Sequence, residues 1–419
     1  MPFIGDFAWF YLSARDMILT GNIPLVGITS SHTWVHQGPL WTYLLAITLY
    51  ISNFNPLSGA YLTGTIGAVT VYLIYKVGTQ MFSKFVGLAS AIFFATSPLV
   101  VLHSRMPYHT SLIPTASILF IFFLYKWIKG DVRFFPLAIF VLGILYNLEL
   151  FTMVFWIMLL LVFAYGVIKK KMWIREAIKL KTVLLSVFLF LFTMLPMIIY
   201  DIRESSGFFQ TTAFFRLIKI YLFSGSQTFN FETMRGVFHS LFTYNQRLVF
   251  LGSGIVALLL TVVSFFYLIV RHSSLARMTK SLLLLWVAIP LCAIIVSQTP
   301  SEAYVPVLFP PVILSISLLL NYIYKLYSFV PIIAIAFIAI TNSYLPLAKN
   351  YLNGFSFSKR LTIAKEIIEK SEGKEYNLIG KGEASEHKSF TMNYEYLTWW
   401  LGHPPSKKPV QFKFVIEEK

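Results

Sequence analysis

An aspartate near the start of the chain, Asp6, is the first residue whose type and surroundings could do chemistry. It begins a helix-like stretch, 6–20, that ends at Gly21 and Pro24. A partly buried carboxylate at such a position could act as a general base and remove the proton of an acceptor hydroxyl. The alternative is a solvated aspartate at a helix start, where its charge interacts favourably with the helix dipole.

A second polar segment, HSRMPYHT at 103–110, separates two apolar runs. Its Arg105 offers a planar guanidinium that is suited to a phosphate or pyrophosphate group, and Tyr108 and His109 lie close to it in sequence. The alternative is an interfacial arginine that extends towards lipid headgroups. The segment therefore predicts either a phosphate contact or a membrane-surface anchor.

A third polar segment, SQTPSEAYVPVLFPP at 297–311, contains Glu302 and Tyr304 directly before an apolar run. Here the alternative is a tyrosine of the interfacial aromatic belt. The chain has no P-loop, zinc-binding motif, GxSxG or dinucleotide fingerprint. Its single cysteine, Cys292, allows neither an intrachain disulfide framework nor a thiolate metal cage. We therefore predict no cofactor and no metal site, because nothing in the sequence supports a divalent metal.

Composition shows which kind of element must position these segments. The 419 residues are 57% hydrophobic and only 12% charged, with a mean hydropathy of +0.70. Soluble globular proteins carry about 25% charged residues, so the chain is predicted to be a polytopic membrane protein. The net charge of +16 does not indicate nucleic-acid binding, because the basic residues form short clusters between apolar segments.

Hydropathy predicts about ten membrane spans, each of which is roughly long enough to cross about 30 Å of hydrocarbon. They are expected near 57–75, 85–103, 111–128, 134–148, 150–168, 182–200, 248–270, 281–297, 305–322 and 327–346. The apolar segment 39–52 is shorter, and it is expected to lie at the membrane interface rather than to cross.

Basic residues alternate between the loops and so predict the topology. After the first span, every second loop is basic, and these loops contain Lys76, Lys84, Lys126, Lys129, Arg133, Lys169, Lys170, Lys171, Arg175, Lys179, Lys181, Arg271, Arg277, Lys280 and Lys325. Short basic loops accumulate on the cytoplasmic side. Residues 1–56, the 201–247 loop and the C-terminal tail are then extracytoplasmic, together with all three polar segments.

The composition changes near residue 350, after which the chain is rich in Lys and Glu and contains no span. Amphipathic spacing predicts a helix at 357–371, and a strand at 375–380, a helix at 389–402 and a strand at 410–417 follow. We predict a transmembrane domain over 1–349, with a first external loop at 1–56, and a small soluble α/β domain over 350–419.

The order of these features resembles the GT-C glycosyltransferases, in particular the protein O-mannosyltransferase and lipid A aminoarabinose transferase branch. The similar segments are WFYLSARDMILTGNIPL after the first acidic residue, the interfacial helix GPLWTYLLAITLY, the arginine turn HSRMPYHT, the late EAYVPVLFPPVILSISLLL, and YEYLTWWLGHPP and QFKFVIEE in the tail. The resemblance covers nearly the whole chain. It implies a GT-C-like helical bundle and a first span that the chain lacks ahead of Asp6.

Carried onto this sequence, the resemblance implies that Asp6 is the catalytic base, Arg105 a contact of the donor phosphate and Tyr304 a residue of the active cavity. Many relatives have two acidic residues at the first site, where this chain has Asp6-Phe7. The arginine turn of relatives often ends in an acidic residue, where this chain has Tyr108-His109.

A lysine found before the interfacial helix of some relatives is replaced here by Gln37-Gly38. Phosphate contact would then fall to Arg105, His36 or His109. The predicted substrate-binding residues are therefore Arg105, Tyr108, His109, His36, Gln37, Glu302 and Tyr304, with Asp6 as the catalytic residue.

The function expected from the resemblance is inverting transfer of a hexosyl, mannosyl or aminoarabinose unit from a polyprenyl-phosphate donor. The acceptor would be a hydroxyl on a protein, lipid or glycan at the extracytoplasmic face of the cell membrane. Two alternatives stay open: a transporter or flippase of lipid-linked saccharides, and a non-catalytic membrane subunit. The chain shows no repeated halves, which are typical of transporters.

Overall fold

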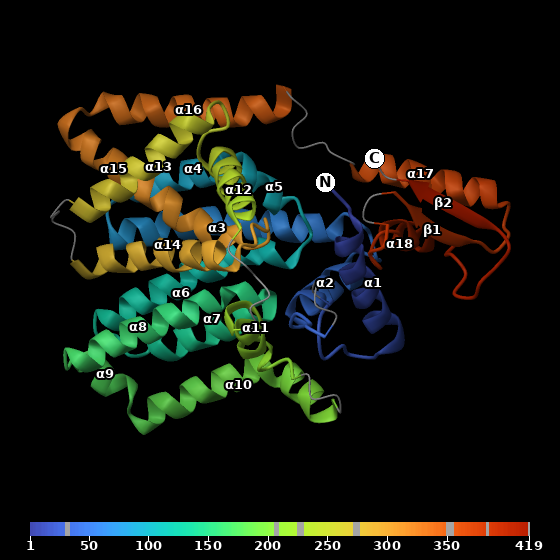
Figure 1. Cartoon of the computed structure of the whole chain (residues 1–419), viewed down its shortest axis with the longest axis horizontal. Coiled ribbons are helices and arrows are strands. Elements are labelled where there is room, and N and C mark those ends of the chain that lie inside the picture. The colour runs from blue at the N-terminus through green and yellow to red at the C-terminus, as the bar shows by residue number, and fades with distance from the viewer. Residues whose placement is uncertain are drawn as a thin grey trace.

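Helices form most of the structure, a computed structural model that describes residues 1–29, 34–204, 209–223, 230–270, 277–348, 356–382 and 385–417 (Figure 1). In the first half these are α1 (Gly5–Thr20), α2 (Leu40–Ile51), α3 (Ser58–Met81), α4 (Lys84–Thr96), α5 (Pro98–Ser104), η1 (His109–Leu112), α6 (Ile113–Ile128), α7 (Phe134–Leu148), η2 (Leu150–Met153), α8 (Val154–Ile168), α9 (Met172–Ala177) and α10 (Leu180–Arg203). The second half contains α11 (Ala213–Phe223), α12 (Phe231–Val249), α13 (Gly254–Val270), α14 (Arg277–Ser297), η3 (Val305–Leu308), α15 (Phe309–Leu326) and α16 (Phe329–Ala348).

Seven helices within the described ranges are long and apolar enough to cross a membrane, or up to nine spans if each of two bent helix pairs counts as one. The prediction of a helical multi-pass membrane protein is confirmed, with fewer spans than the ten expected. The predicted span 134–148 forms α7, whose fifteen residues measure about 22 Å. Helix α2 has twelve residues, or about 18 Å, which agrees with the expectation that segment 39–52 does not cross.

Two of the predicted spans are bent. Helices α4 and α5 meet at 66° around Ser97, where the serine side chain caps α5 and Pro98 starts it. A proline fits a first helical turn but cannot continue the hydrogen-bond ladder of the preceding helix, so the chain turns here. The predicted span 248–270 is replaced by α12, which ends at Val249, and by α13, which leaves it at 88°.

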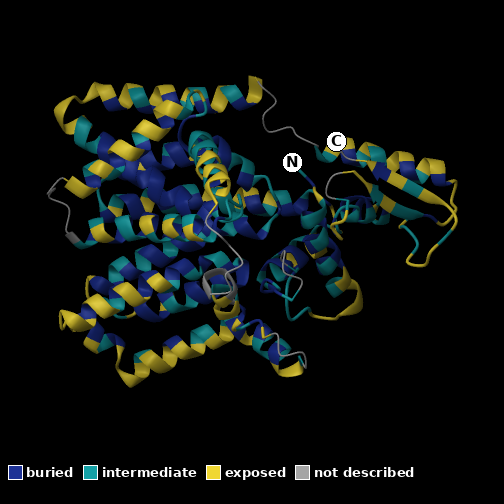
Figure 2. Ribbon diagram, viewed as in Figure 1, coloured by how far each residue is buried: buried dark blue, intermediate teal, exposed yellow. Residues whose placement is uncertain are grey.

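Burial separates the inner helices from those at the periphery of the bundle. The apolar span formed by η3 and α15 is 78% buried, whereas the one formed by α10 is 17% buried (Figure 2). The exposed side chains of α10 are mostly apolar, among them Leu184, Phe188 and Phe192. Such a surface is stable in hydrocarbon and not in water, so α10 is a lipid-facing helix.

The C-terminal elements form a small α/β unit of α17 (Phe357–Ser371), β1 (Asn377–Lys381), α18 (Met392–Trp400) and β2 (Lys413–Glu417). The two strands are parallel, with Asn377 opposite Lys413, and helix α18 lies in the connection between them. Helix α17 has the bounds that its amphipathic spacing predicts. Figure 1 shows this unit beside α1 and α2, at one end of the bundle.

Candidate functional site

Helix α1 presents Asp6 in its first turn and ends at Gly21, whose φ of 73° lies in the left-handed region. The Ser389 hydroxyl of the C-terminal unit donates a 2.6 Å hydrogen bond to Asp6 Oδ1. This is the one hydrogen bond that the Asp6 carboxylate makes within the described residues. Its second oxygen is therefore available to another donor.

Backbone hydrogen bonds and one serine hydroxyl hold the turn that contains Arg105. Ser111 Oγ donates to the carbonyl oxygens of His103 at 2.7 Å and Met106 at 3.0 Å, one on each side of Arg105. The guanidinium itself is half-buried and has no ion pair or hydrogen bond within the described parts of the chain. A fixed backbone with an unpaired cation is a suitable arrangement for binding an anion.

Tyr108 connects the first and second polar segments in space. Its ring centroid lies 5.0 Å from that of Phe7 and 4.0 Å from that of His109. Burial raises the pKa of the Tyr108 phenol, and the nearby charges of Asp6 and Glu149 and the Tyr304 phenol raise it further. These groups thus lie around one phenol, although they come from four separate parts of the chain.

His109, Gln37 and Glu149 form a buried polar cluster next to Tyr108. Glu149 Oε2 lies 3.3 Å from His109 Nε2, and Gln37 Nε2 lies 3.0 Å from the same nitrogen. The Gln37 amide also donates to Glu149 Oε2 at 3.5 Å. Two atoms of this cluster, His109 Nδ1 and Gln37 Oε1, are buried with no hydrogen-bond partner within the described residues. Buried polar atoms without a partner cost free energy, so a ligand that paired with these two atoms would be stabilised.

Sequence reasoning missed Glu149, which belongs to none of the three polar segments. It follows α7 directly, where the Gly38 amide donates to the Asn147 carbonyl at 3.0 Å. A Cβ atom on Gly38 would lie 2.2 Å from Asn147 Oδ1, so only glycine permits this approach. The available signal was an isolated carboxylate in an otherwise apolar sequence, LYNLELF.

His36 contacts a different set of residues from its neighbour Gln37. Its ring Nδ1 lies 3.2 Å from the Gly27 carbonyl, and its backbone N–H donates to Gln210 Oε1 at 2.8 Å. Gln210 is itself held by Asp201, whose Oδ1 accepts a 2.6 Å hydrogen bond from the Gln210 backbone N–H. None of these partners belongs to the cluster of His109, Gln37 and Glu149. The binding role of His36 stays a prediction.

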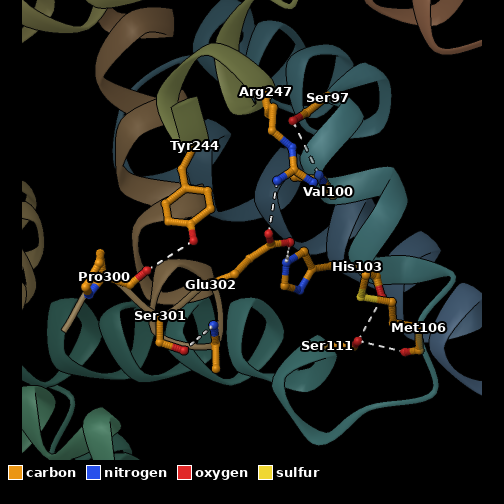
Figure 3. A network of polar contacts seen from close by, with 11 residues as sticks. Ser97, Val100, His103, Met106, Ser111, Tyr244, Arg247, Pro300, Ser301 and Glu302 are labelled. Carbon is orange, nitrogen blue, oxygen red and sulfur yellow. Dashed lines mark hydrogen bonds and ion pairs between the residues drawn. The ribbon is translucent and has the colours of Figure 1, made fainter. Parts of the chain in front are cut away.

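Glu302 lies in a polar network that connects α5, α12 and the turn before η3 (Figure 3). His103 Nε2 lies 3.2 Å from Glu302 Oε1, and Arg247 donates to Oε2 at 3.0 Å. Burial opposes ionisation of Glu302, but the hydrogen bond to His103 and the charge of Arg247 outweigh it and lower the pKa of this carboxyl. The Tyr244 hydroxyl donates to the Pro300 carbonyl at 3.1 Å, which fixes the same turn.

Tyr304 follows that turn and stacks on Phe151, with ring centroids 4.5 Å apart and planes at 13°. Phe151 comes two residues after Glu149, so η2 supports both the tyrosine and the carboxylate of the cluster. Within the described parts of the chain, no three His, Cys, Asp or Glu side chains come together as a metal-binding group.

Comparison with known proteins gives a family match and two structural likenesses. Residues 36–200 match the model of the family described as dolichyl-phosphate-mannose-protein mannosyltransferase. This stretch includes Gln37, Arg105, Tyr108, His109 and Glu149. Over these residues the expected resemblance to the protein O-mannosyltransferases is confirmed. No curated relative matches the chain.

The solved structures of ArnT from Cupriavidus metallidurans are similar to this fold at low sequence identity. The apo structure is 12% identical with a TM-score of 0.46, and the match covers 97% of this chain and 80% of ArnT. The structure bound to undecaprenyl phosphate is 10% identical with a TM-score of 0.46, and that match covers 96% and 80%.

Proposed function

We propose that this protein is an inverting glycosyltransferase that moves a sugar from a polyprenyl-phosphate donor to an acceptor hydroxyl at the extracytoplasmic face. The observation that carries the proposal is a cation that is unpaired within the described residues, Arg105, in the turn that also contains Tyr108. The Tyr108 ring packs against Phe7, the residue after Asp6, with ring centroids 5.0 Å apart. The matched family acts with dolichyl-phosphate mannose, by its description, which supports a donor of this class.

The proposed reaction exchanges one bond at the anomeric carbon for another. The acceptor oxygen forms a bond with that carbon while the bond from the carbon to the donor phosphate oxygen breaks. The acceptor proton moves to Asp6 Oδ2, and the electron pair of the broken bond leaves with the polyprenyl phosphate. Attack opposite the leaving group inverts the anomeric configuration.

Arg105 is proposed to stabilise the charge that grows on the leaving phosphate. Since a phosphate is already a good leaving group, positioning and charge stabilisation can support transfer, so we propose no metal or cofactor. Gln37, His109 and Tyr304 are proposed to line the donor side of the site. Glu302 is bound by two basic side chains, so its proposed role is to fix the turn that carries Tyr304.

The proposed sidedness rests on the separation of the two sets of loops. The α8–α9 connection, which contains three lysines at 169–171, and the end of α15, which contains Lys325 in its last turn, lie at the end of the bundle opposite α1 and α2 (Figure 1). The positive-inside rule then assigns the end that carries Asp6 to the outside. A reporter fused after Lys181 should be cytoplasmic and one fused after Lys419 extracytoplasmic, and the reverse result would contradict this topology.

Sugar transfer from synthetic polyprenyl-phosphate donors to membrane extracts tests the proposed function. Radiolabelled mannosyl, other hexosyl and aminoarabinosyl donors should be compared, because the sugar is not specified by the residues described. Asp6→Asn should lower transfer by about 100-fold or more, the usual contribution of a general base.

The matched control for this experiment is Asp16→Asn, on the same helix. Asp16 is 59% exposed in its side chain and pairs with Arg15, so its loss should leave transfer near the wild-type rate. Equal transfer by Asp6→Asn and wild type would remove Asp6 as the base. Wild-type protein that moves intact donor across vesicles without transferring its sugar would favour a flippase.

A further inference from the structure

The C-terminal α/β unit shares a hydrophobic core with the first two helices. Tyr396 of α18 packs edge-on against Tyr11 of α1, with ring centroids 5.0 Å apart, and its hydroxyl donates to the Phe54 carbonyl at 2.8 Å. Arg15 of α1 lies over the Trp399 ring, 4.9 Å from its centroid. These contacts join α18 to the middle of α1 and to the residues that follow α2, and they fix its position on α1.

At the first turn of α1 the same unit contacts the site itself. Ser389 is 9% exposed, and its hydroxyl donates to Asp6 Oδ1 at 2.6 Å. A Cβ atom on Gly5 would lie 1.8 Å from the Ser389 carbonyl oxygen, so the two backbones are in direct contact. That carbonyl also accepts the Met392 amide at 3.1 Å, which ties Ser389 to the start of α18.

We infer that Ser389 is a positioning residue that orients the Asp6 carboxylate for proton transfer, a role that rests on the proposed function. The serine hydroxyl occupies Oδ1 and thereby fixes the plane of the carboxylate. Oδ2 is left to receive the acceptor proton. The C-terminal unit thus supplies a group that the site needs, from 383 residues away in the sequence.

The geometry predicts a specific kinetic pattern for the loss of this hydroxyl. In Ser389→Ala the Asp6 side chain gains rotamer freedom, and its reactive oxygen spends less time in line with the acceptor. Because misplacement of a catalytic group by about 1 Å can cost roughly 100-fold in rate, kcat should fall by about 10- to 100-fold. The donor KM should change by less than about two-fold, since Ser389 does not contact the donor in the proposed reaction.

The experiment measures kcat and donor KM for the purified full-length protein with the polyprenyl-phosphate sugar that the wild type uses. Ser389→Thr keeps a hydroxyl and should restore most of kcat. Ser371→Ala is the matched control, because Ser371 is fully buried in the same unit and donates to the Ile368 carbonyl, not to Asp6. All variants should unfold at temperatures close to that of the wild type.

Each other outcome overturns the inference. If Ser389→Ala keeps the wild-type kcat while Asp6→Asn is inactive, Asp6 remains the base and only the role of Ser389 is wrong. An equal loss in Ser389→Ala and Ser371→Ala, or no recovery in Ser389→Thr, would reduce the contact to a structural one. Absence of transfer by the wild type from any donor would overturn the proposed function and this role with it.

Discussion

Two carboxylates of this protein, Asp6 and Glu302, have opposite kinds of partners. Glu302 faces a basic side chain at each oxygen, His103 at one and Arg247 at the other. Asp6 has a single neutral donor, Ser389, at one oxygen. A carboxylate bound by an arginine and a histidine is stabilised in its charged form and is a weak base, whereas one with a free oxygen can accept a proton. The arrangement at Glu302 stabilises the fold, and the arrangement at Asp6 is suited to accepting a proton.

Two arginines repeat the same contrast. Arg247 is 17% exposed in its side chain and is bound to Glu302. Arg105 has no ion pair within the described residues, although Ser111 fixes the backbone on both sides of it. Arg247 is thus paired within the protein, whereas Arg105 is available to bind an anionic ligand.

Loss of Arg105 should have the largest effect and should act on the donor. Arg105→Ala is expected to lower kcat/KM for a polyprenyl-phosphate sugar by about 100-fold, since hydrogen bonds to a charged group contribute about 1.5–3 kcal/mol each. Arg105→Lys should recover only part, because a lysine cannot form two parallel bonds to a phosphate. Thermal unfolding should be unchanged. A large drop in the unfolding temperature would instead show that Arg105, like Arg247, stabilises the fold.

Loss of Glu302 should act mainly on stability. Glu302→Ala leaves Arg247 and the buried His103 without their carboxylate, which should lower the free energy of unfolding by about 2 kcal/mol. This figure allows for the 32% exposure of the Glu302 side chain. Chemical denaturation in detergent micelles measures it. If Glu302→Ala unfolds like the wild type but fails to transfer sugar, the contrast between the two carboxylates is wrong.

Loss of Glu149 should also act on stability, with an effect no larger than that of losing Glu302. Glu149→Ala removes the acceptor next to two buried groups, His109 and Gln37, and should lower the free energy of unfolding by about 1–2 kcal/mol. Glu149→Gln keeps one carbonyl oxygen towards the His109 ring, so the loss should be at most half as large. The same denaturation assay compares the two variants. Equal losses in both would show that the charge of Glu149, and not its hydrogen bonding, stabilises the cluster.

The smallest expected effect is a pH dependence of stability. The pKa of Glu302 is lower in the folded chain than its ordinary value of 4.5, so its ionised form stabilises the fold above that pH. This contribution is lost as the pH falls through the folded pKa. The difference in unfolding temperature between wild type and Glu302→Gln should therefore shrink from about pH 5 to about pH 3. A constant difference would show that the ion pair adds no net stability.

Local sequence patterns predicted several elements well. Alternating basic loops and apolar runs predicted a multi-pass helical bundle, and amphipathic spacing gave the bounds of α17. The helical stretch 6–20 and its stop at Gly21 match α1. These features depend on residues that are near one another in the chain, where periodicity and capping act directly.

The bends in two spans were less predictable. Hydropathy averages over a window of about 19 residues, so it does not register a change of direction within that window. Ser97-Pro98 carried a readable signal for the first bend, but the 88° turn between α12 and α13 depends on how these helices pack.

By itself the sequence determined the fold class, because hydrophobicity and local spacing are properties of the chain, and its charge pattern predicted the topology of the loops. Only the tertiary structure decided which polar residues meet. It brought Glu149 to His109 and Gln37, Ser389 to Asp6, and His103 and Arg247 to Glu302. Partners so distant in sequence leave no periodic signal, since their contact depends on packing between elements whose orientation hydrophobicity does not specify.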